Sequence, residues 1–192
     1  MDDSTIKLVT DLAALKIVAH PLRARLLGAL RMHGPATASE LGRRFDESSG
    51  STSYHLRELA KHDFVELDPE QHNARDKRWR ATARYTSWRN SDFGDVEGRE
   101  ATRALRGNQT AFLIDKLERH DAAVDELEDV WRDTLAMSDY AAELSPESVR
   151  ELQRRTLALV EELREKDRGR PDTRFVRLYL AALIDPDDQD AP

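Results

Sequence analysis

Basic side chains gather in one short segment of this chain, where they could bind phosphate. Four cations occupy six positions between residues 75 and 80, and one acid, Asp76, interrupts them. Clusters of Lys and Arg neutralise the backbone of a nucleic acid and supply much of its salt-dependent affinity. The candidates are these four cations, Arg75, Lys77, Arg78 and Arg80, together with the neutral Asn73 next to them.

A second group of candidates lies on a helix expected over residues 49–62. At 100° per residue, Thr52, Leu56 and Leu59 fall on its inner side, while the opposite side is polar. Small hydroxyls, an aromatic ring and an imidazole near the start of such a helix can reach base edges in a major groove. The candidates for base and phosphate contacts are Ser49, Gly50, Ser51, Ser53, Tyr54, His55, Arg57 and Lys61.

Both groups also have a plainer interpretation. A run of charge is usually a solvated hairpin, and Tyr54 could equally pack against a neighbouring helix. Glu58 lies on the outer side of the same helix and would repel phosphate, although a carboxylate can also accept a hydrogen bond from cytosine. The position of the basic run beside this helix favours nucleic-acid binding.

Apolar spacing predicts the elements that hold these residues. A short helix is expected over residues 11–19, and a second one begins at Pro21 and ends at Gly34-Pro35. Thr37-Ala-Ser-Glu40 is a capping box, which predicts a third, short helix. Residues 64–81 alternate as a hairpin with a basic second arm.

This order of elements resembles the ArsR/SmtB-like winged helix-turn-helix repressors. The matching stretches are Leu15 to Leu27, Thr37-Ala-Ser-Glu-Leu41, Phe64-Val65 and, most specifically, Ser51-Thr-Ser-Tyr-His-Leu-Arg-Glu-Leu59. The family has a glycine after this last helix, where Asp63 stands here, and Asp tolerates the left-handed region better than most residues. The resemblance implies a DNA-binding repressor with helix 49–62 in the major groove and residues 64–81 as the wing.

Metal sensing and catalysis are not expected. The cysteine-bearing motif of the family aligns with Thr37-Ala38-Ser39, and the chain contains no cysteine. His55 and His62 are about 10.5 Å apart along a helix, too far for one zinc ion. His120 with Asp115 or Asp121 could join an interhelical metal site, but a histidine in a helix seam is more often a polar core residue. No phosphate-binding loop, nucleophile elbow or zinc-protease motif is present, so we expect neither a cofactor nor an enzyme.

Charge divides the chain into two expected domains. Residues 1–90 carry a net charge of +3 and residues 91–192 one of −10, within a total of −7. We therefore expect a winged helix-turn-helix domain over residues 1–90 and an acidic helical region over residues 91–192. The expected fold class is mainly α with small β.

The acidic half is expected to form a homodimer. A long helix, or two with a break at Gly107, is predicted between Val96 and Met137, and another helix begins at Ser145-Pro146. Both carry narrow apolar seams suited to helix pairing, although such seams could also pack within one chain. The candidate interface residues are Leu113, Leu117, Val124, Leu127, Trp131, Leu152, Leu159 and Leu163.

The end of the chain is ambiguous in its pattern. Residues 173–184 fit a strand that pairs with residues 83–88, and a terminal helix fits nearly as well. A small-molecule effector could bind between the C-terminal helices, but no residue identifies it.

The sequence thus predicts a dimeric regulator that binds double-stranded DNA at a pseudopalindromic operator. With no apolar run long enough for a membrane span, we expect a soluble, cytoplasmic protein. The alternative is a protein-interaction module whose winged helix no longer reads DNA, which the acidic total charge and Glu58 favour.

Overall fold

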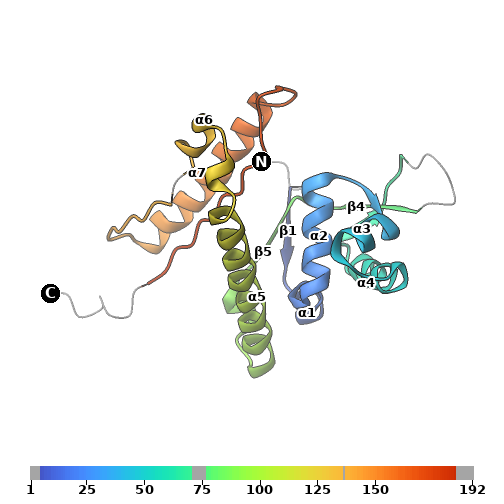
Figure 1. Ribbon diagram of the computed structural model, residues 1–192. Coiled ribbons are helices and arrows are strands. Elements are labelled where there is room, and N and C mark those ends of the chain that lie inside the picture. The colour runs from blue at the N-terminus through green and yellow to red at the C-terminus, as the bar shows by residue number, and fades with distance from the viewer. Residues whose placement is uncertain (1–4, 71–76, 136, 185–192) are drawn as a thin grey trace. The chain divides into compact units, whose positions relative to one another are not determined.

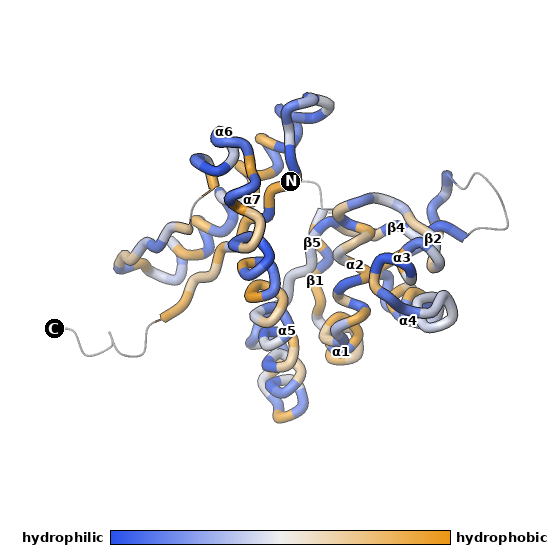
Figure 2. Tube along the Cα trace, in the orientation of Figure 1, coloured by the Kyte–Doolittle hydropathy of each residue, from blue (hydrophilic) through white to orange (hydrophobic). Residues whose placement is uncertain are grey.

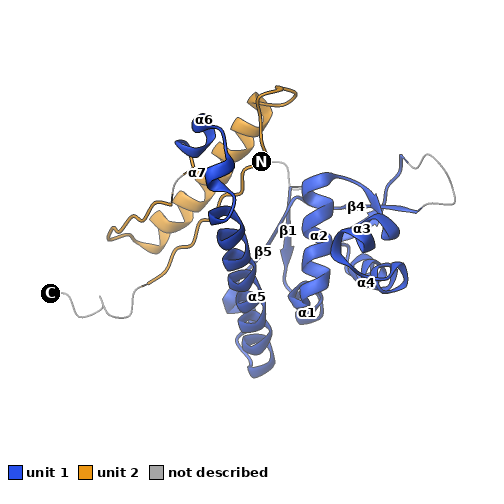
Figure 3. Ribbon diagram, viewed as in Figure 1, with its two compact units in different colours: residues 1–134 blue, residues 135–192 orange. Residues whose placement is uncertain are grey.

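The computed structural model describes residues 5–70, 77–135 and 137–184 and divides into two compact units, residues 1–134 and 135–192 (Figure 3). The predicted fold class, mainly α-helical with small β-sheets, is confirmed. The sequence predicted a division at residue 90, whereas the helix that follows this position packs within the first unit.

Two helices supply much of the core of the first unit (Figure 1). α1 (Leu12–Ala19) begins after Asp11, whose carboxylate accepts a hydrogen bond from the Ala14 amide. α2 (Pro21–His33) ends at Gly34, whose φ of +80° suits a residue without a side chain. Figure 2 shows α1 as a largely apolar segment, as expected of a helix buried on its core side. Both helices agree with the sequence prediction.

α3 and α4 follow and pack closely on each other. α3 (Ala38–Phe45) begins with the predicted capping box: the Glu40 amide donates to the Thr37 hydroxyl, and the Thr37 amide donates to the Glu40 carboxylate. α4 (Ser49–Lys61) coincides with the predicted helix 49–62 to within one residue. A Cβ at Gly42 would lie 2.7 Å from the Glu47 carbonyl oxygen, so the two helices can approach this closely only with glycine there.

A hairpin completes the arrangement. β3 (Val65–Leu67) pairs antiparallel with β4 (Arg78–Ala81), and β4 also pairs with the short strand β2 (Ala36–Thr37), which gives the sheet order β2-β4-β3. The turn before β3 passes through Asp63 at φ +56°, the left-handed conformation expected where the related family has glycine. The predicted wing at residues 64–81 therefore contains two paired strands.

A second, two-stranded sheet joins distant parts of the chain. β1 (Ile6–Val9) runs parallel to β5 (Tyr85–Trp88), with Ile6 beside Tyr85. The sequence predicted β5 but not β1, and its suggested partner for β5, residues 173–184, is wrong. Arg31 on α2 fixes β5 from the side, because its guanidinium donates to the Ala83 carbonyl and to the Thr86 hydroxyl.

The core of the first unit lies between these elements. Its largest apolar side chains that are completely or almost completely buried come from α1, α2, α3, α4, the strands and the turn before β3. They are Val9, Leu15, Leu26, Leu41, Leu56, Leu59, Phe64 and Val65. Burial of these groups from water is the main favourable contribution to folding of this unit.

The first half of α5 (Val96–Asp121) belongs to this core. It follows the 3-10 helix η1 (Asn90–Phe93) and buries Gly98, Ala101, Thr102 and Leu105, which are spaced as one helical face, and it packs on α1. The Asn108 side chain donates to the carbonyl of Ala19 at the end of α1. These contacts hold α5 on the N-terminal elements.

Neither predicted form of the segment from Val96 to Met137, one long helix or two with a break at Gly107, matches the structure, because α5 runs through Gly107 and ends at Asp121. After Asp121 the chain forms η2 (Val124–Glu126) and the single turn α6 (Asp129–Arg132). The candidate seam residues Leu113, Leu117, Val124, Leu127 and Trp131 are therefore spread over α5, η2, α6 and the loop between the last two, and do not form one helical stripe.

The second unit contains one long helix. α7 (Pro146–Lys166) begins as predicted: the Ser145 hydroxyl accepts from the Ser148 amide, and Pro146 occupies the first helical position. The candidates Leu152, Leu159 and Leu163 lie on its surface. Residues 173–184 form neither the strand nor the helix that the sequence predicted, and their backbone is irregular.

Candidate nucleic-acid interface

The start of α4 presents hydroxyls and free backbone amides together. The Ser48 hydroxyl accepts from the Ser51 amide at 3.1 Å, which caps the helix. The Ser51 hydroxyl donates to the Glu47 carboxylate at 3.2 Å, so it is held toward its own turn. Ser49 and Gly50 are exposed in the first turn, where the amides of a helix and its dipole attract anions.

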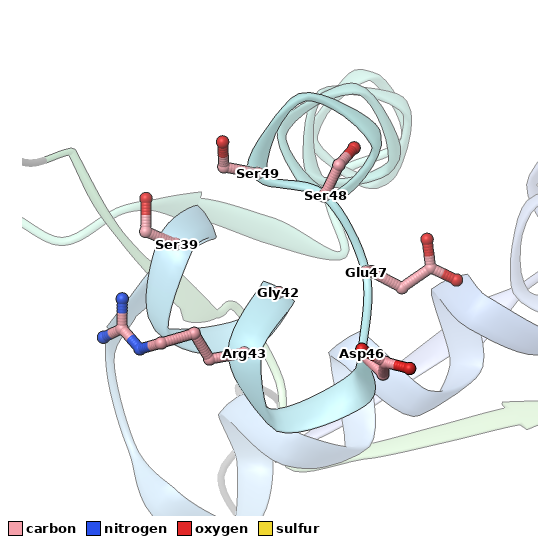
Figure 4. Close-up of a pocket in the computed structure, with 7 residues that line it drawn as sticks. All are labelled: Ser39, Gly42, Arg43, Asp46, Glu47, Ser48 and Ser49. Atoms are coloured by element: carbon pink, nitrogen blue, oxygen red, sulfur yellow. The ribbon is translucent and has the colours of Figure 1, made fainter.

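Beside this helix start lies a shallow, open hollow of about 520 Å³ between α3 and α4. Figure 4 shows the Ser39 and Ser49 hydroxyls and the Arg43 guanidinium on one side of it, with the carboxylates of Asp46 and Glu47 on the other. Sequence reasoning missed Ser39 and Arg43. The signal was their position in the first two turns of the helix that begins with the capping box, directly before the candidate helix.

The outer face of α4 combines an aromatic ring with charges. Tyr54 keeps 54% of its surface exposed. Arg57 is exposed as well, and its guanidinium donates to the Ser53 hydroxyl one turn earlier, at 2.9 Å. Lys61 lies 2.5 Å from the Glu58 carboxylate; this contact lowers the pKa of Glu58 and raises that of Lys61. The repulsion of phosphate expected from Glu58 is therefore offset on the same helix.

His55 lies differently from its neighbours. Its ring is half-buried and packs on the ring of His20 at the start of α2, with centroids 4.7 Å apart. The Nδ1 atoms of both rings, and Nε of Arg23, are buried without a hydrogen-bond partner among the described residues. Of the predicted contact residues on this helix, His55 is thus the one that also joins α4 to α2.

The wing cations have unequal surroundings. Lys77 is exposed and forms no ion pair with a described residue. Arg78 donates to the Pro35 carbonyl and lies 3.7 Å from the Glu40 carboxylate, while Arg80 pairs with Glu66 across the hairpin at 2.7 Å. The candidates Asn73 and Arg75 lie outside the described residues.

The described part of the chain contains neither a cluster of metal ligands nor a membrane-spanning helix. Within residues 5–70, 77–135 and 137–184, no three histidine, aspartate or glutamate side chains gather as metal ligands. In the same ranges, no helix has the length and apolar character needed to cross a bilayer.

In a comparison with protein families, residues 18–68 match the family described as helix-turn-helix domain. This span begins at the end of α1 and ends after β3, and it includes α2, α3 and α4. These residues form a helix-turn-helix domain. The resemblance predicted from Thr37 to Leu41 and from Ser51 to Leu59 is thereby confirmed. In this domain α4 is the second helix of the motif, which is where the sequence predicted the contact residues.

Comparison with solved structures finds several similar chains. The Lactococcus lactis protein ZitR in complex with DNA is 12% identical, with 74% of each chain covered and a TM-score of 0.33. RV1404 from Mycobacterium tuberculosis is 15% identical, with 78% of this chain and 81% of that chain covered and a TM-score of 0.31. The adhesin competence repressor AdcR from Streptococcus pyogenes is 13% identical, with 75% and 81% covered and a TM-score of 0.31. No curated protein sequence matches this chain.

The helix-turn-helix domain therefore brings four of the predicted contact residues to one exposed side. The exposed start and outer face of α4 carry Ser49, Gly50, Tyr54 and Arg57. Ser39 and Arg43 of α3 lie next to the start of α4. The strand β4 follows Lys77 and is joined to the start of α3 through β2. Hydroxyls, an aromatic ring and cations are the groups that bind phosphates and base edges.

Proposed function

We propose that this protein is a homodimeric transcriptional regulator that binds a pseudopalindromic operator through its helix-turn-helix domain. The observation that carries the proposal is the exposed start of α4, where Ser49, Gly50 and Tyr54 stand free of the core while Thr52 and Leu56 are buried. A helix held in this way can enter a major groove with its first two turns.

Phosphate contacts would flank this helix on both sides. One strand of the duplex would meet Ser39, Arg43 and the first amides of α4, and the other strand would meet Arg57. Phosphate contacts of this kind fix the orientation of a helix in the groove. Lys77, with Arg75 beyond the described residues, would add charge from the wing, next to the minor groove.

A dimer is part of the proposal. A regulator that reads two half-sites must present two recognition helices about 34 Å apart, which a twofold pair of chains provides. The resemblance to ArsR/SmtB-like repressors makes repression the direction that we propose. With DNA as its partner, the compartment that we propose for the protein is the cytoplasm.

A second candidate is a protein-interaction module that no longer reads DNA. The favouring observation is that three cations near the interface already face acids: Lys61 faces Glu58, Arg80 faces Glu66 and Arg78 faces Glu40. In this alternative, the acidic partners cancel the positive field that a DNA-binding surface needs.

The experiment that separates the two is a binding titration of the full chain. One labelled fragment is taken from upstream of its own gene and another has the same bases scrambled, and both are titrated at about 150 mM salt and again at lower salt. A preference of roughly a thousandfold for the upstream fragment would support the regulator. Equal, weak binding to both fragments would require a search for a different operator. The absence of binding even at low salt would favour the interaction module.

A further inference from the structure

α7 has an apolar stripe that the other described residues of its own unit leave partly exposed. Leu152, Leu159 and Leu163 keep 45%, 53% and 43% of their surface exposed, and none of the helix's residues is buried. With Val149 and Thr156, these residues recur at alternating spacings of three and four, the pattern of positions a and d in a heptad. Figure 2 shows apolar and charged residues interleaved along this helix. Such a stripe is suited to one partner helix.

Most acids of α7 form ion pairs with arginines of the same helix or of the turn that follows it. Their ion pairs run along the surface: Glu147 with Arg150, Glu151 with Arg154 and Arg155, Glu161 with Arg164, and Glu165 with Arg164 and Arg168. Glu162 differs, because it forms no ion pair with any residue in the described part of the chain. Glu162 and Arg155 occupy equivalent positions that flank the apolar stripe, one heptad apart.

We propose that the occupant of this stripe is α7 of a second copy of the chain, packed antiparallel. This inference rests on the homodimer of the proposed function and names its contact. In an antiparallel pair, position a of one helix meets position d of the other, so Leu152 would meet Leu163 of the partner subunit. The flanking positions then bring Arg155 to Glu162 of the partner subunit, and the twofold axis makes this pair twice.

A parallel pair is disfavoured by the same residues. Parallel packing places Glu162 next to Asp167 of the partner subunit, which creates two like-charge contacts. It also stacks Thr156 on Thr156 of the partner subunit in the middle of the stripe, where the antiparallel arrangement pairs each threonine with a leucine. Charge complementarity and the position of the one polar layer therefore select the antiparallel orientation.

Charge reversal tests the proposal with DNA absent. The full chain and the variants Arg155→Glu, Glu162→Arg and the double variant are compared by sedimentation velocity over a concentration series. Each single change places like charges at both symmetric contacts and should weaken the dimer roughly tenfold. The double variant restores opposite charges and should recover the dissociation constant of the unaltered chain.

Arg154→Glu is the matched control. Arg154 pairs with Glu151, as Arg155 does, but it lies on the face of the helix opposite the apolar stripe. Its charge reversal therefore removes an equivalent ion pair with Glu151 and should leave the dimer unchanged. A chain that stays monomeric would overturn the proposal, as would equal effects of Arg154→Glu and Arg155→Glu. Tighter association of Glu162→Arg would show parallel packing and overturn it as well. Operator binding is measured separately, so its failure would leave this result standing.

Discussion

The rings of His20 and His55, with centroids 4.7 Å apart, connect the start of α2 to the outer face of α4. Burial is the main cause that lowers the pKa of both imidazoles, and the Arg23 guanidinium lowers them further. The carboxylates of Glu47 and Glu58 act on His55 in the opposite direction. The neutral rings are therefore the forms that the folded domain favours, and α4 is packed on them.

Mild acid is predicted to destabilise the helix-turn-helix domain through this pair. Because the folded pKa values lie below the unfolded value of 6.5, the unfolded chain binds more protons in this range. The histidine pair contributes its full stability above pH 6.5. This stability is lost as the pH falls from 6.5 toward the lower pKa values of the folded domain. Urea unfolding at pH values on both sides of 6.5 measures the loss.

The variant His20→Gln separates this effect from ordinary acid unfolding. It removes one titrating ring and the mutual repulsion of the pair, so its unfolding free energy should fall less steeply between neutral and mildly acidic pH. His120→Gln, on the exposed end of α5, serves as the control and should behave like the unaltered chain. Identical pH dependence in all three proteins would show that the pair has no influence.

Replacement of two different glycines by alanine should change the unfolding free energy in opposite directions. Gly42→Ala is predicted to lower the unfolding free energy by about 1–3 kcal/mol, because the new methyl group would lie 2.7 Å from the Glu47 carbonyl oxygen and 3.3 Å from the Thr52 hydroxyl. Gly107→Ala, in the interior of α5 with open space around it, should raise stability by about 0.5–1 kcal/mol. Thermal or urea unfolding of both variants tests the close packing of α3 on α4, and a neutral Gly42→Ala would contradict it.

Neighbouring wing cations should separate into a DNA-binding residue and a structural one. Lys77→Ala should weaken operator binding and reduce the salt dependence by about one counterion, with stability changed by no more than about 0.5 kcal/mol. Arg78→Ala should cost about 1 kcal/mol of stability, because the Pro35 carbonyl and the Glu40 carboxylate lose their partner. Salt-dependent binding and urea unfolding of each variant give the comparison; the reverse assignment of the two effects would count against the site described here.

Arg31 is predicted to be structural. Its part-buried guanidinium, whose pKa burial lowers to about 10, donates to the Ala83 carbonyl at 2.9 Å and to the Thr86 hydroxyl at 2.7 Å. Arg31→Ala should lower the unfolding free energy by about 1–3 kcal/mol, since the Ala83 carbonyl would lose this donor. Arg89→Ala, exposed just after β5, is the control and should be close to neutral. Loss of DNA affinity in Arg31→Ala with unchanged stability would contradict this role.

Local signals in the sequence were sufficient to predict much of the helix-turn-helix domain. The capping box at Thr37 and Glu40 depends on residues three positions apart, and the faces of α4 follow from helical geometry alone. β1 has no such signal, since Ile6 to Val9 gains its partner only when β5 arrives from far along the chain. The orientation of His55 toward His20 is likewise a tertiary contact.

The end of α5 at Asp121 could have been predicted from the spacing of the acidic residues that follow it. Asp121, Asp125, Asp129 and Asp133 follow one another at spacings of four, so a continued helix would stack like charges turn upon turn. Acids at the end of a helix also oppose its dipole. This repulsion was available from the sequence, whereas the apolar spacing of Leu117, Val124 and Leu127 pointed to one continuous helix.

The parallel pairing of β1 with β5 makes the chain enter and leave the helix-turn-helix domain side by side and in the same direction, with Val9 next to Trp88. The segment from Thr10 to Arg84 thus begins and ends at the same two-stranded sheet, whose pairing holds its two ends together. Truncation of the chain before Asp11 would remove β1 and leave β5 without its partner strand. Because β5 leads through η1 directly into α5, the loss of β1 would disturb the start of α5 more directly than α4.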